Sequence, residues 1–229
     1  MPDRAAFVTV CALAGALALP MNPIITPLAA ALTGLLGLLG LRVWRWSGLT
    51  EVMRTSGRPG VMRAIRIPLW LALGLAAGLV ILMVMRLALE PSMPAIGARI
   101  SAAGAVELWR RAIIIYVAAV TEELVFRLLA LSVLAGLGAR LLRGTGHHPT
   151  RAVAWTAIAV SALAFAAVHL PAWSAMMPLS AGLAAAVIAL NAAGGLLLGH
   201  VFVTRGIAAA IWTHAGADCA IQIIGPMTG

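Results

Sequence analysis

The amino-acid sequence predicts an all-α protein, a polytopic transmembrane helix bundle of about seven spans. Three observations support this prediction. Hydrophobic residues make up 62% of the 229 residues, charged residues only 10%, and the mean hydropathy is +1.03. An ordinary water-soluble domain carries about 25% charged residues. The apolar residues also occur in long runs separated by short segments that contain Arg, Pro or Gly, as expected for helices that cross a bilayer.

Seven apolar segments approach the length of about 20 residues that a helix needs to cross a bilayer. The first is short and is joined to the second by Pro20-Met21-Asn22-Pro23, so we expect these two to form a tight helical hairpin. The sixth and seventh are separated only by Arg205-Gly206, and a re-entrant segment there would bring the number of spans to eight. The predicted spans are residues 5–20, 22–41, 67–88, 107–138, 152–170, 179–203 and 206–225.

The charge of the chain indicates how the spans are oriented. All 16 basic residues are arginine, seven carboxylates oppose them, and the net charge is +9. Because the arginines fall in short stretches between apolar runs and not along one polar face, they do not predict a nucleic-acid partner. They crowd the connections around 42–66 and 140–151, which the positive-inside rule assigns to the cytoplasm. The opposite loops, around 89–106 and 171–178, contain only Arg99. The N-terminus is then predicted to be cytoplasmic and the C-terminus outside. The high Arg and Ala content is typical of a GC-rich bacterial genome, so we expect a bacterial inner membrane.

Ionisable residues inside the spans are the strongest functional candidates, because a charge near the bilayer centre costs roughly 2.5 to 3.5 kcal/mol even on a lenient scale. Glu123 and Arg127, in the fourth span, have the i,i+4 spacing of an ion pair on one helix face. Glu122 points about 100° away from Glu123 in an α-helix and has no such local partner. Its charge must therefore be met by another helix.

His169 is the predicted partner of Glu122. The fourth and fifth spans are joined by a short loop centred near Thr145, with Glu122 23 residues before it and His169 24 residues after it. The two side chains should therefore lie at similar depth, where a carboxylate and an imidazole can polarise a water molecule. In the seventh span, the i,i+4 pair His214 and Asp218 would supply a hydrogen-bond donor for an oxyanion if it faces the same cavity.

Each of these residues also has a structural interpretation. Glu123 and Arg127 could be a purely structural pair that locks the helix in place, and His169 could simply cap a helix before Pro171. His214 and Asp218 could serve to join helices by hydrogen bonds. We interpret Asn191 and His200 as polar residues that bind neighbouring helices. Gly194, Gly195 and Gly199 are interpreted as small residues that let helices approach closely. Cys11 and Cys219 show no spacing that indicates a disulfide or a metal site.

Three motifs in the second half of the chain resemble those of the CPBP family, the CAAX prenyl endopeptidase and bacteriocin-processing (Abi) group of intramembrane proteases. They are Glu122-Glu123-Leu-Val-Phe126-Arg127, Phe165-Ala-Ala-Val-His169 and His214-Ala-Gly-Ala-Asp218. Each motif alone is weak, but three in the right order in separate spans make a specific pattern across residues 105 to 222. We therefore divide the chain into N-terminal helices with a basic loop, 1–104, and a catalytic helix core, 105–229.

The resemblance implies a glutamate-dependent intramembrane protease that needs no cofactor or metal and acts on a membrane-associated protein or peptide. Glu122 and His169 would activate water, and His214 with Asp218 would form the oxyanion site. Glu123 and Arg127 would shape the site or help to hold the substrate, and Phe126 and Phe165 would complete its walls. The CAAX-processing branch usually has asparagine where this chain has Asp218. An aspartate donates a hydrogen bond only when protonated, so Asp218 either is protonated in this site or orients His214. This difference favours an Abi-like member.

Three other functions stay open at this point. Glu122, His169 and His214 could supply a three-ligand zinc site of a membrane peptidase, although the sequence contains no H-E-x-x-H motif. The same polar residues could line the path of a transporter or proton relay, although no inverted repeat supports that function. A scaffold without catalytic activity is the third alternative. The substrate and the oligomeric state do not follow from the sequence.

Overall fold

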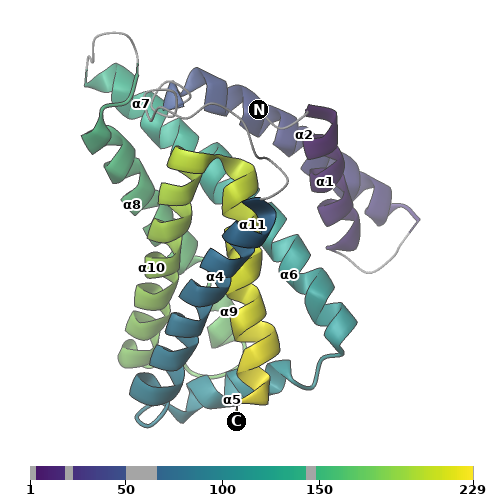
Figure 1. Ribbon diagram of the computed structural model, residues 1–229, viewed down its shortest axis with the longest axis vertical. Coiled ribbons are helices and arrows are strands. Elements are labelled where there is room, and N and C mark those ends of the chain that lie inside the picture. Colours follow the sequence, from purple (N-terminus) through teal and green to yellow (C-terminus); the bar gives the residue numbers. More distant parts are fainter. Residues whose placement is uncertain (1–3, 19–22, 50–65, 143–147, 229) are drawn as a thin grey trace.

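The chain folds as a helix bundle in the computed structural model, which describes residues 4–18, 23–49, 66–142 and 148–228 (Figure 1). Every regular element in these ranges is helical, which confirms the predicted fold class. Six helical segments in the described residues are long and apolar enough to cross a membrane, and they make the chain an integral membrane protein. They are Ile25–Trp46, Ile67–Leu89, Leu108–Leu141, Arg151–Ser174, Ala181–Arg205 and Ile207–Met227.

The first predicted span is shorter than the others. It forms the 14-residue helix α1 (Arg4–Leu17), too short for a complete crossing at 1.5 Å per residue, and packs along α2 (Ile25–Trp46). Residues 19–22 of the predicted hairpin lie outside the described residues. The remaining elements are α4 (Arg66–Met83), η1 (Val84–Leu89), α5 (Pro94–Ala103), α6 (Leu108–Glu122), η2 (Glu123–Leu131), α7 (Ser132–Leu141), α8 (Arg151–Ala167), α9 (Leu170–Ser174), α10 (Ala181–Arg205), α11 (Ile207–Cys219), η3 (Ala220–Ile224) and η4 (Gly225–Met227).

Two short helices lie where the sequence analysis expected only loops. Pro94 begins α5, within the predicted connection 89–106, and α9 follows directly after His169. Proline fits the first turn of a helix, where its missing N–H leaves no hydrogen bond unmade. Pro171 accordingly sits in the first turn of α9. The predicted eighth or re-entrant segment is absent from the described residues, since α10 and α11 are separated only by Gly206 at φ 93°.

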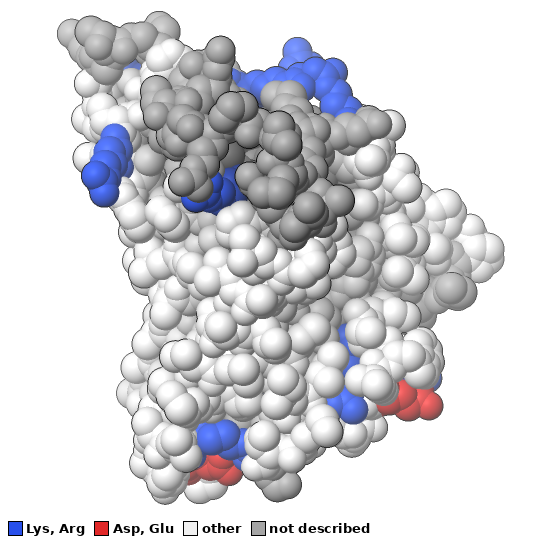
Figure 2. Space-filling model, viewed as in Figure 1, with Lys and Arg blue, Asp and Glu red and all other residues white. Residues whose placement is uncertain are grey.

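The surface has the charge distribution of a membrane protein. Figure 2 shows charged atoms gathered at the two ends of this face, with a broad uncharged belt between them. Large apolar side chains are exposed on the helices, among them Leu28, Leu69 and Leu163 at 66%, 58% and 56%. Lipid tails can cover such side chains at no cost, whereas water cannot.

The helix ends that precede the two arginine-rich connections, those of α2 and α7, lie at the same end of the bundle, as predicted from their charge. Arg140, in α7, donates to the backbone carbonyl of Trp46 at 3.0 Å and stacks over its ring at 3.9 Å, so the ends of α2 and α7 meet. Arg54, Arg58, Arg63 and Arg143 of these connections lie outside the described residues. The cytoplasmic assignment of this end stays a prediction.

The opposite end holds α5, α9 and the C-terminus (Figure 1). The sequence analysis placed only Arg99 in the loops of this end, but Arg86 and Arg110 lie nearby. Each of these two pairs with a glutamate: Arg86 with Glu90 at 3.0 Å, and Arg110 with Glu107 at 3.0 Å. Pairing lowers the net charge of this end of the bundle.

Glycines set the closest helix contacts. A Cβ at Gly195 of α10 would lie 2.9 Å from Cβ of Ala162 in α8, and one at Gly199 would meet Ile158 at 2.8 Å. These two glycines therefore act as predicted, whereas Gly194 does not: a Cβ there would have only Ile81 nearby, at 4.0 Å. The α4–α11 contact, at Gly74 against the Thr213 carbonyl, was not predicted.

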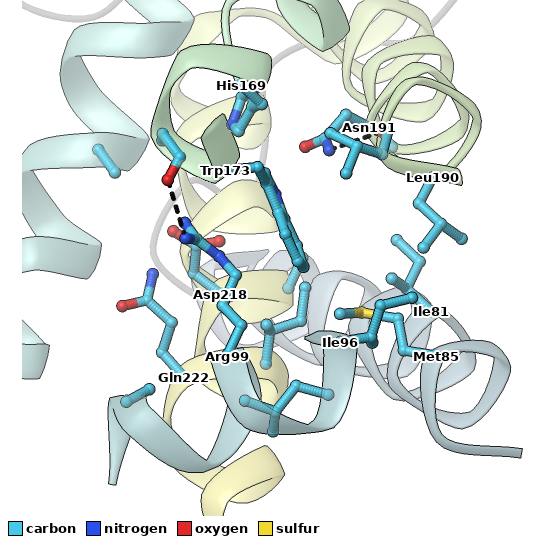
Figure 3. Close-up of a pocket in the computed structure, with 18 of the residues that line it drawn as sticks. Ile81, Met85, Ile96, Arg99, His169, Trp173, Leu190, Asn191, Asp218 and Gln222 are labelled. Carbon is cyan, nitrogen blue, oxygen red and sulfur yellow. Dashed lines mark hydrogen bonds between the residues drawn. The ribbon is translucent and has the colours of Figure 1, made fainter. Parts of the chain in front are cut away.

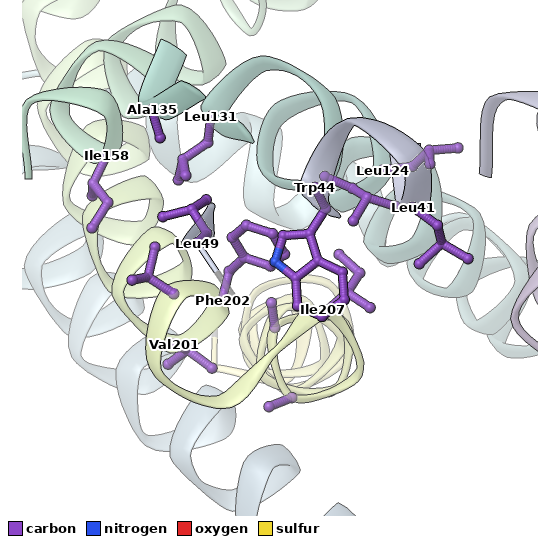
Figure 4. Packing of buried hydrophobic residues seen from close by; sticks show 14 of the residues in the cluster. Leu41, Trp44, Leu49, Leu124, Leu131, Ala135, Ile158, Val201, Phe202 and Ile207 are labelled. Carbon is purple, nitrogen blue, oxygen red and sulfur yellow. The ribbon is translucent and has the colours of Figure 1, made fainter. Parts of the chain in front are cut away.

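Two buried apolar clusters bracket the centre of the bundle. The larger joins the end of α2 to η2, α7, α8, α10 and the start of α11, with Trp44, Leu131 and Phe202 among its members (Figure 4). The smaller, which includes Met85 and Trp173, lies toward α5 and α9.

Candidate active site

A cavity of about 580 Å³ opens beside the motif residues (Figure 3). Its walls are mostly apolar and come from α4, η1, α5, α6, α8, α9, α10, α11 and η3. Ala102, Ala172 and Met176 line it and are exposed, so its mouth lies at the end of the bundle that holds α5 and α9. Its polar lining side chains are Arg99, Glu122, His169, Asn191, His214, Asp218 and Gln222.

Glu122 and His169 face each other in this cavity, at the matching depth that the sequence predicts. The Nε2 atom of His169 lies 3.9 Å from Oε2 of Glu122, and both side chains are about 30% exposed. Nδ1 of His169 is 2.7 Å from the Phe165 carbonyl. Because a carbonyl only accepts, Nδ1 carries a proton. In the neutral imidazole, Nε2 is then a hydrogen-bond acceptor that faces Glu122.

His214 lies at the centre of the polar cluster. Its Nδ1 donates a 3.1 Å hydrogen bond to Oε1 of Glu123 on the neighbouring helix. Its Nε2 points to the cavity, 3.7 Å from Oε2 of Glu122 and 3.9 Å from Oδ2 of Asp218. The hydrogen bond that orients His214 thus comes from Glu123, which the sequence analysis paired only with Arg127.

Glu123 and Arg127 form the predicted ion pair behind the cavity wall. Nε of Arg127 is 3.4 Å from Oε2 of Glu123, and both side chains are 0% exposed. The guanidinium lies over the Phe165 ring, 4.9 Å from its centroid. Neither residue lines the cavity, so their contacts are with His214 and Phe165, and not with the space that a substrate would fill.

A π-helical turn begins at this point of the fourth span. Element η2 starts at Glu123, directly after Glu122 ends α6. Such turns widen a helix and leave backbone groups without their ordinary partners, and they are frequent at functional sites. Here Ser161 donates to the Phe126 carbonyl at 2.6 Å, and Ser132 donates to the Arg127 carbonyl at 3.3 Å. The motif therefore lies on a stretch of helix with altered geometry, which sequence spacing did not reveal.

Phe165 holds the two imidazoles in place. It is 4% exposed and lines the cavity, with its ring centroid 4.7 Å from that of His169 and 5.9 Å from that of His214. Phe126 packs edge-on against Phe165 at 5.4 Å but does not line the cavity. Phe126 of the first motif and Phe165 of the second therefore form a single packed unit with the two imidazoles.

The other polar residues of the spans have different surroundings. Asn191 lines the cavity, but its Nδ2 donates to the Val187 carbonyl of its own helix, so the predicted hydrogen bond to a neighbouring helix is wrong. His200 is exposed and stacks on Trp155 of α8 at 5.5 Å. Arg99 and Gln222 line the cavity without having been candidates, because Arg99 was counted only as a loop charge and no pattern singled out Gln222.

Within the described residues, no three side chains of His, Cys, Asp or Glu converge in a way that could hold a metal ion. Cys11 is buried between α1 and α2, and Cys219 is partly buried. Neither cysteine lines the cavity.

The fold and the site define a class: a polytopic membrane protein with a carboxylate and two imidazoles in an apolar cavity. The family model of the type II CAAX prenyl endopeptidases, Rce1-like, matches residues 104–220. The chain belongs to this family, a branch of the CPBP group that the motifs resemble. No curated protein and no solved structure matched the chain. The family supports a CAAX-type intramembrane protease, a hydrolase embedded in the membrane that acts on a peptide substrate.

Proposed function

We propose that the chain is a glutamate-dependent intramembrane endopeptidase in which Glu122 and His169 activate a water molecule. The observation that carries the proposal is the placement of the Glu122 carboxylate and the His169 Nε2 atom 3.9 Å apart in one cavity. This separation is too long for a direct hydrogen bond and suits a water that contacts both atoms.

In this mechanism Glu122 accepts a proton from the water as its oxygen attacks the peptide carbonyl. His169 accepts the second hydrogen bond of the same water through Nε2, because its Nδ1–H is held by the Phe165 carbonyl. A proton held on the site can then pass to the leaving amine. The apolar walls of the cavity exclude bulk water and strengthen these electrostatic interactions.

His214 would stabilise the oxyanion. With Nδ1–H bound to Glu123, Nε2 carries a hydrogen only when the ring is an imidazolium, which then donates toward the cavity. The charge of that imidazolium would be balanced by the carboxylates of Glu122 and Glu123, which lie 3.7 and 3.1 Å from the ring nitrogens. A fixed hydrogen-bond donor of this kind stabilises the negative charge that develops on the oxygen in the transition state.

Asp218 would be the second oxyanion donor, in its protonated form. The alternative, that it orients His214, has less support because Glu123 makes the shorter contact with that ring, 3.1 Å against 3.9 Å. Glu123, Arg127 and Phe126 would shape the site from behind its wall, while Phe165 contributes to the wall itself. The preference for an Abi-like member rests on Asp218. It stays a prediction, because the family match does not show which substrate this chain cleaves.

The test is cleavage of a quenched-fluorescent peptide library by detergent-purified protein, with and without a strong chelator. Glu122→Gln should lower kcat by about 10²–10⁴-fold, and His169→Ala and His214→Ala should abolish cleavage while each protein still inserts. Glu107→Gln is the matched control, because Glu107 pairs with Arg110 at the surface and lies outside the cavity. Normal cleavage by Glu122→Gln would overturn the proposal.

The same assay separates the other functions. Activity that the chelator removes would favour the zinc peptidase. Absence of cleavage by the unmodified protein, across peptides with and without lipid anchors, would favour the transporter or the scaffold.

A further inference from the structure

Arg99 is the one arginine among the residues that line the cavity within the described part of the chain. It lies on α5, and its side chain rises into the part of the cavity where His169 and Asp218 lie (Figure 3). No motif includes it, and the family match starts after it, at residue 104. Its function is therefore open.

One edge of the Arg99 guanidinium is fixed by contacts with α9 and with Met176, two residues beyond its end. Nη1 donates to the Ala172 carbonyl at 3.2 Å and contacts the sulfur of Met176. The guanidinium lies 4.5 Å from the centroid of the Trp173 ring, a cation–π contact. These contacts hold the charged group in one place at the mouth of the cavity.

The other edge is free. Across residues 4–18, 23–49, 66–142 and 148–228, no carboxylate lies within 4 Å of Arg99, and Nε and Nη2 make no hydrogen bond. This differs from Arg86 and Arg110 at the same end of the bundle, which pair with Glu90 and Glu107. The Nε–Nη2 edge of a guanidinium matches the two oxygens of a carboxylate.

Partial burial makes an anionic partner more favourable. It lowers the pKa of Arg99 from its ordinary value, because desolvation penalises the charged form. An arginine nevertheless remains protonated at neutral pH. A held, partly desolvated cation with a free edge therefore faces the cavity.

We propose that Arg99 binds a carboxylate of the substrate peptide and so positions the peptide in the cavity. This inference rests on the proposed function, since it names a substrate feature for the same site. The carboxylate has two sources in a peptide, a free C-terminus or an Asp or Glu side chain. In either case the anionic group enters at the α5–α9 end, while the scissile bond lies farther in, at Glu122 and His169.

The test measures binding to the full-length Glu122→Gln variant, which removes cleavage from the measurement. The probe is a fluorescein-labelled apolar decapeptide in three forms: a free C-terminal carboxylate, a C-terminal amide, and the amide with one internal glutamate. We expect the Kd of at least one carboxylate form to be lower than that of the plain amide by a factor of about ten or more, as hydrogen bonds to charged groups allow. The preferred form identifies the source of the carboxylate.

Adding Arg99→Gln should remove this preference by weakening the carboxylate form to the Kd of the plain amide. Arg99→Lys should restore part of it, because it keeps the charge but loses the planar fork. Arg110→Gln is the matched control: it changes the net charge equally and lies outside the cavity, so the preference should persist.

Equal or absent binding of the three forms would overturn the proposal, as would an equal loss of affinity for all three in Arg99→Gln. The latter result would mean that Arg99 only supports the walls of the cavity. Because binding is measured without turnover, these outcomes are separate from a failure of the unmodified protein to cleave peptides, which would count against the proposed function.

Discussion

Adjacent residues on two helices of this bundle have opposite surroundings. Glu122 faces the cavity and is 29% exposed, whereas Glu123 is 0% exposed and contacts His214 and Arg127. On α10, Gly194 lines the cavity, whereas Gly195 packs against Ala162. One step along a helix turns a side chain by about 100°, enough to move it from the site to the packed interior.

The comparison teaches that residues of one motif can have different physical functions. A cavity-facing residue can take part in the reaction without contributing much to stability. A packed residue stabilises the fold and affects the reaction through the neighbours that it positions. Substitutions at the two kinds of position should therefore affect different measurements, and the pairs of neighbours offer controls that differ in position alone.

The largest effect on stability is expected at Glu123. Glu123→Ala leaves the Arg127 guanidinium buried without its partner, and breaking a buried pair in this way costs about 3–5 kcal/mol. Glu122→Ala should change the unfolding free energy much less, because its carboxylate is partly exposed and has no hydrogen bond shorter than 3.5 Å in the described residues. The free energy of unfolding is to be measured in detergent, with tryptophan fluorescence as the readout.

Equal unfolding free energies for Glu122→Ala and Glu123→Ala would contradict the distinction between a cavity-facing and a packed glutamate. The double variant Glu123→Ala with Arg127→Met should recover part of the loss, because it removes the unpaired charge.

Asp218 should have the largest effect on turnover after Glu122, His169 and His214. Asp218→Ala removes a donor from the proposed oxyanion site and should lower kcat by about 10²-fold or more. Asp218→Asn should keep most of the activity, because an amide donates a hydrogen bond in every protonation state. Both variants are to be compared by kcat and KM on one cleaved peptide, and a loss in Asp218→Asn as great as in Asp218→Ala would contradict the donor role.

The sequence was sufficient to bring the principal site residues together. Matched depth around Thr145 predicted that Glu122 meets His169, and the i,i+4 rule predicted the Glu123–Arg127 pair, because residues four apart lie on one helix face. The His214–Glu123 hydrogen bond was missed, because it depends on the rotation of α11 against η2. Arg99 was missed because a residue in a predicted loop has no periodicity to show which way it points.

A smaller effect on stability separates the two glycines. Ala at either position gains helix propensity, about 1 kcal/mol relative to Gly, so this gain cancels when the two variants are compared. Gly195→Ala in addition places a Cβ 2.9 Å from Cβ of Ala162, and overpacking of this kind costs about 1–3 kcal/mol. We expect Gly194→Ala to unfold at the same temperature as the unmodified protein or higher, and Gly195→Ala at a lower one. The reverse order would mean that the α8–α10 contact can relax.

The fold was predicted more completely than its contacts. Long apolar runs predicted all six segments that are long enough to cross a membrane, from Ile25–Trp46 to Ile207–Met227, because the length of a span is a direct consequence of bilayer thickness. They did not distinguish the short α1 from a full span, nor reveal α5, because composition does not report tertiary packing. The α4–α11 contact was within reach of the sequence, since Gly74 and Gly78 form a G-x-x-x-G pattern.

The smallest effect is expected for a pair that resembles Glu123–Arg127 in chemistry but not in position. Arg110 lies 3.0 Å from Glu107 with both side chains more than 60% exposed, and exposed pairs contribute only about 0.2–1 kcal/mol. Arg110→Gln should therefore change the unfolding free energy by less than about 1 kcal/mol, and high salt should reduce even that change. Arg127→Gln, measured beside it, leaves Glu123 buried without its cation and should remain destabilising at every salt concentration. If the two arginine variants lost the same unfolding free energy, burial would not determine how much each ion pair contributes to stability.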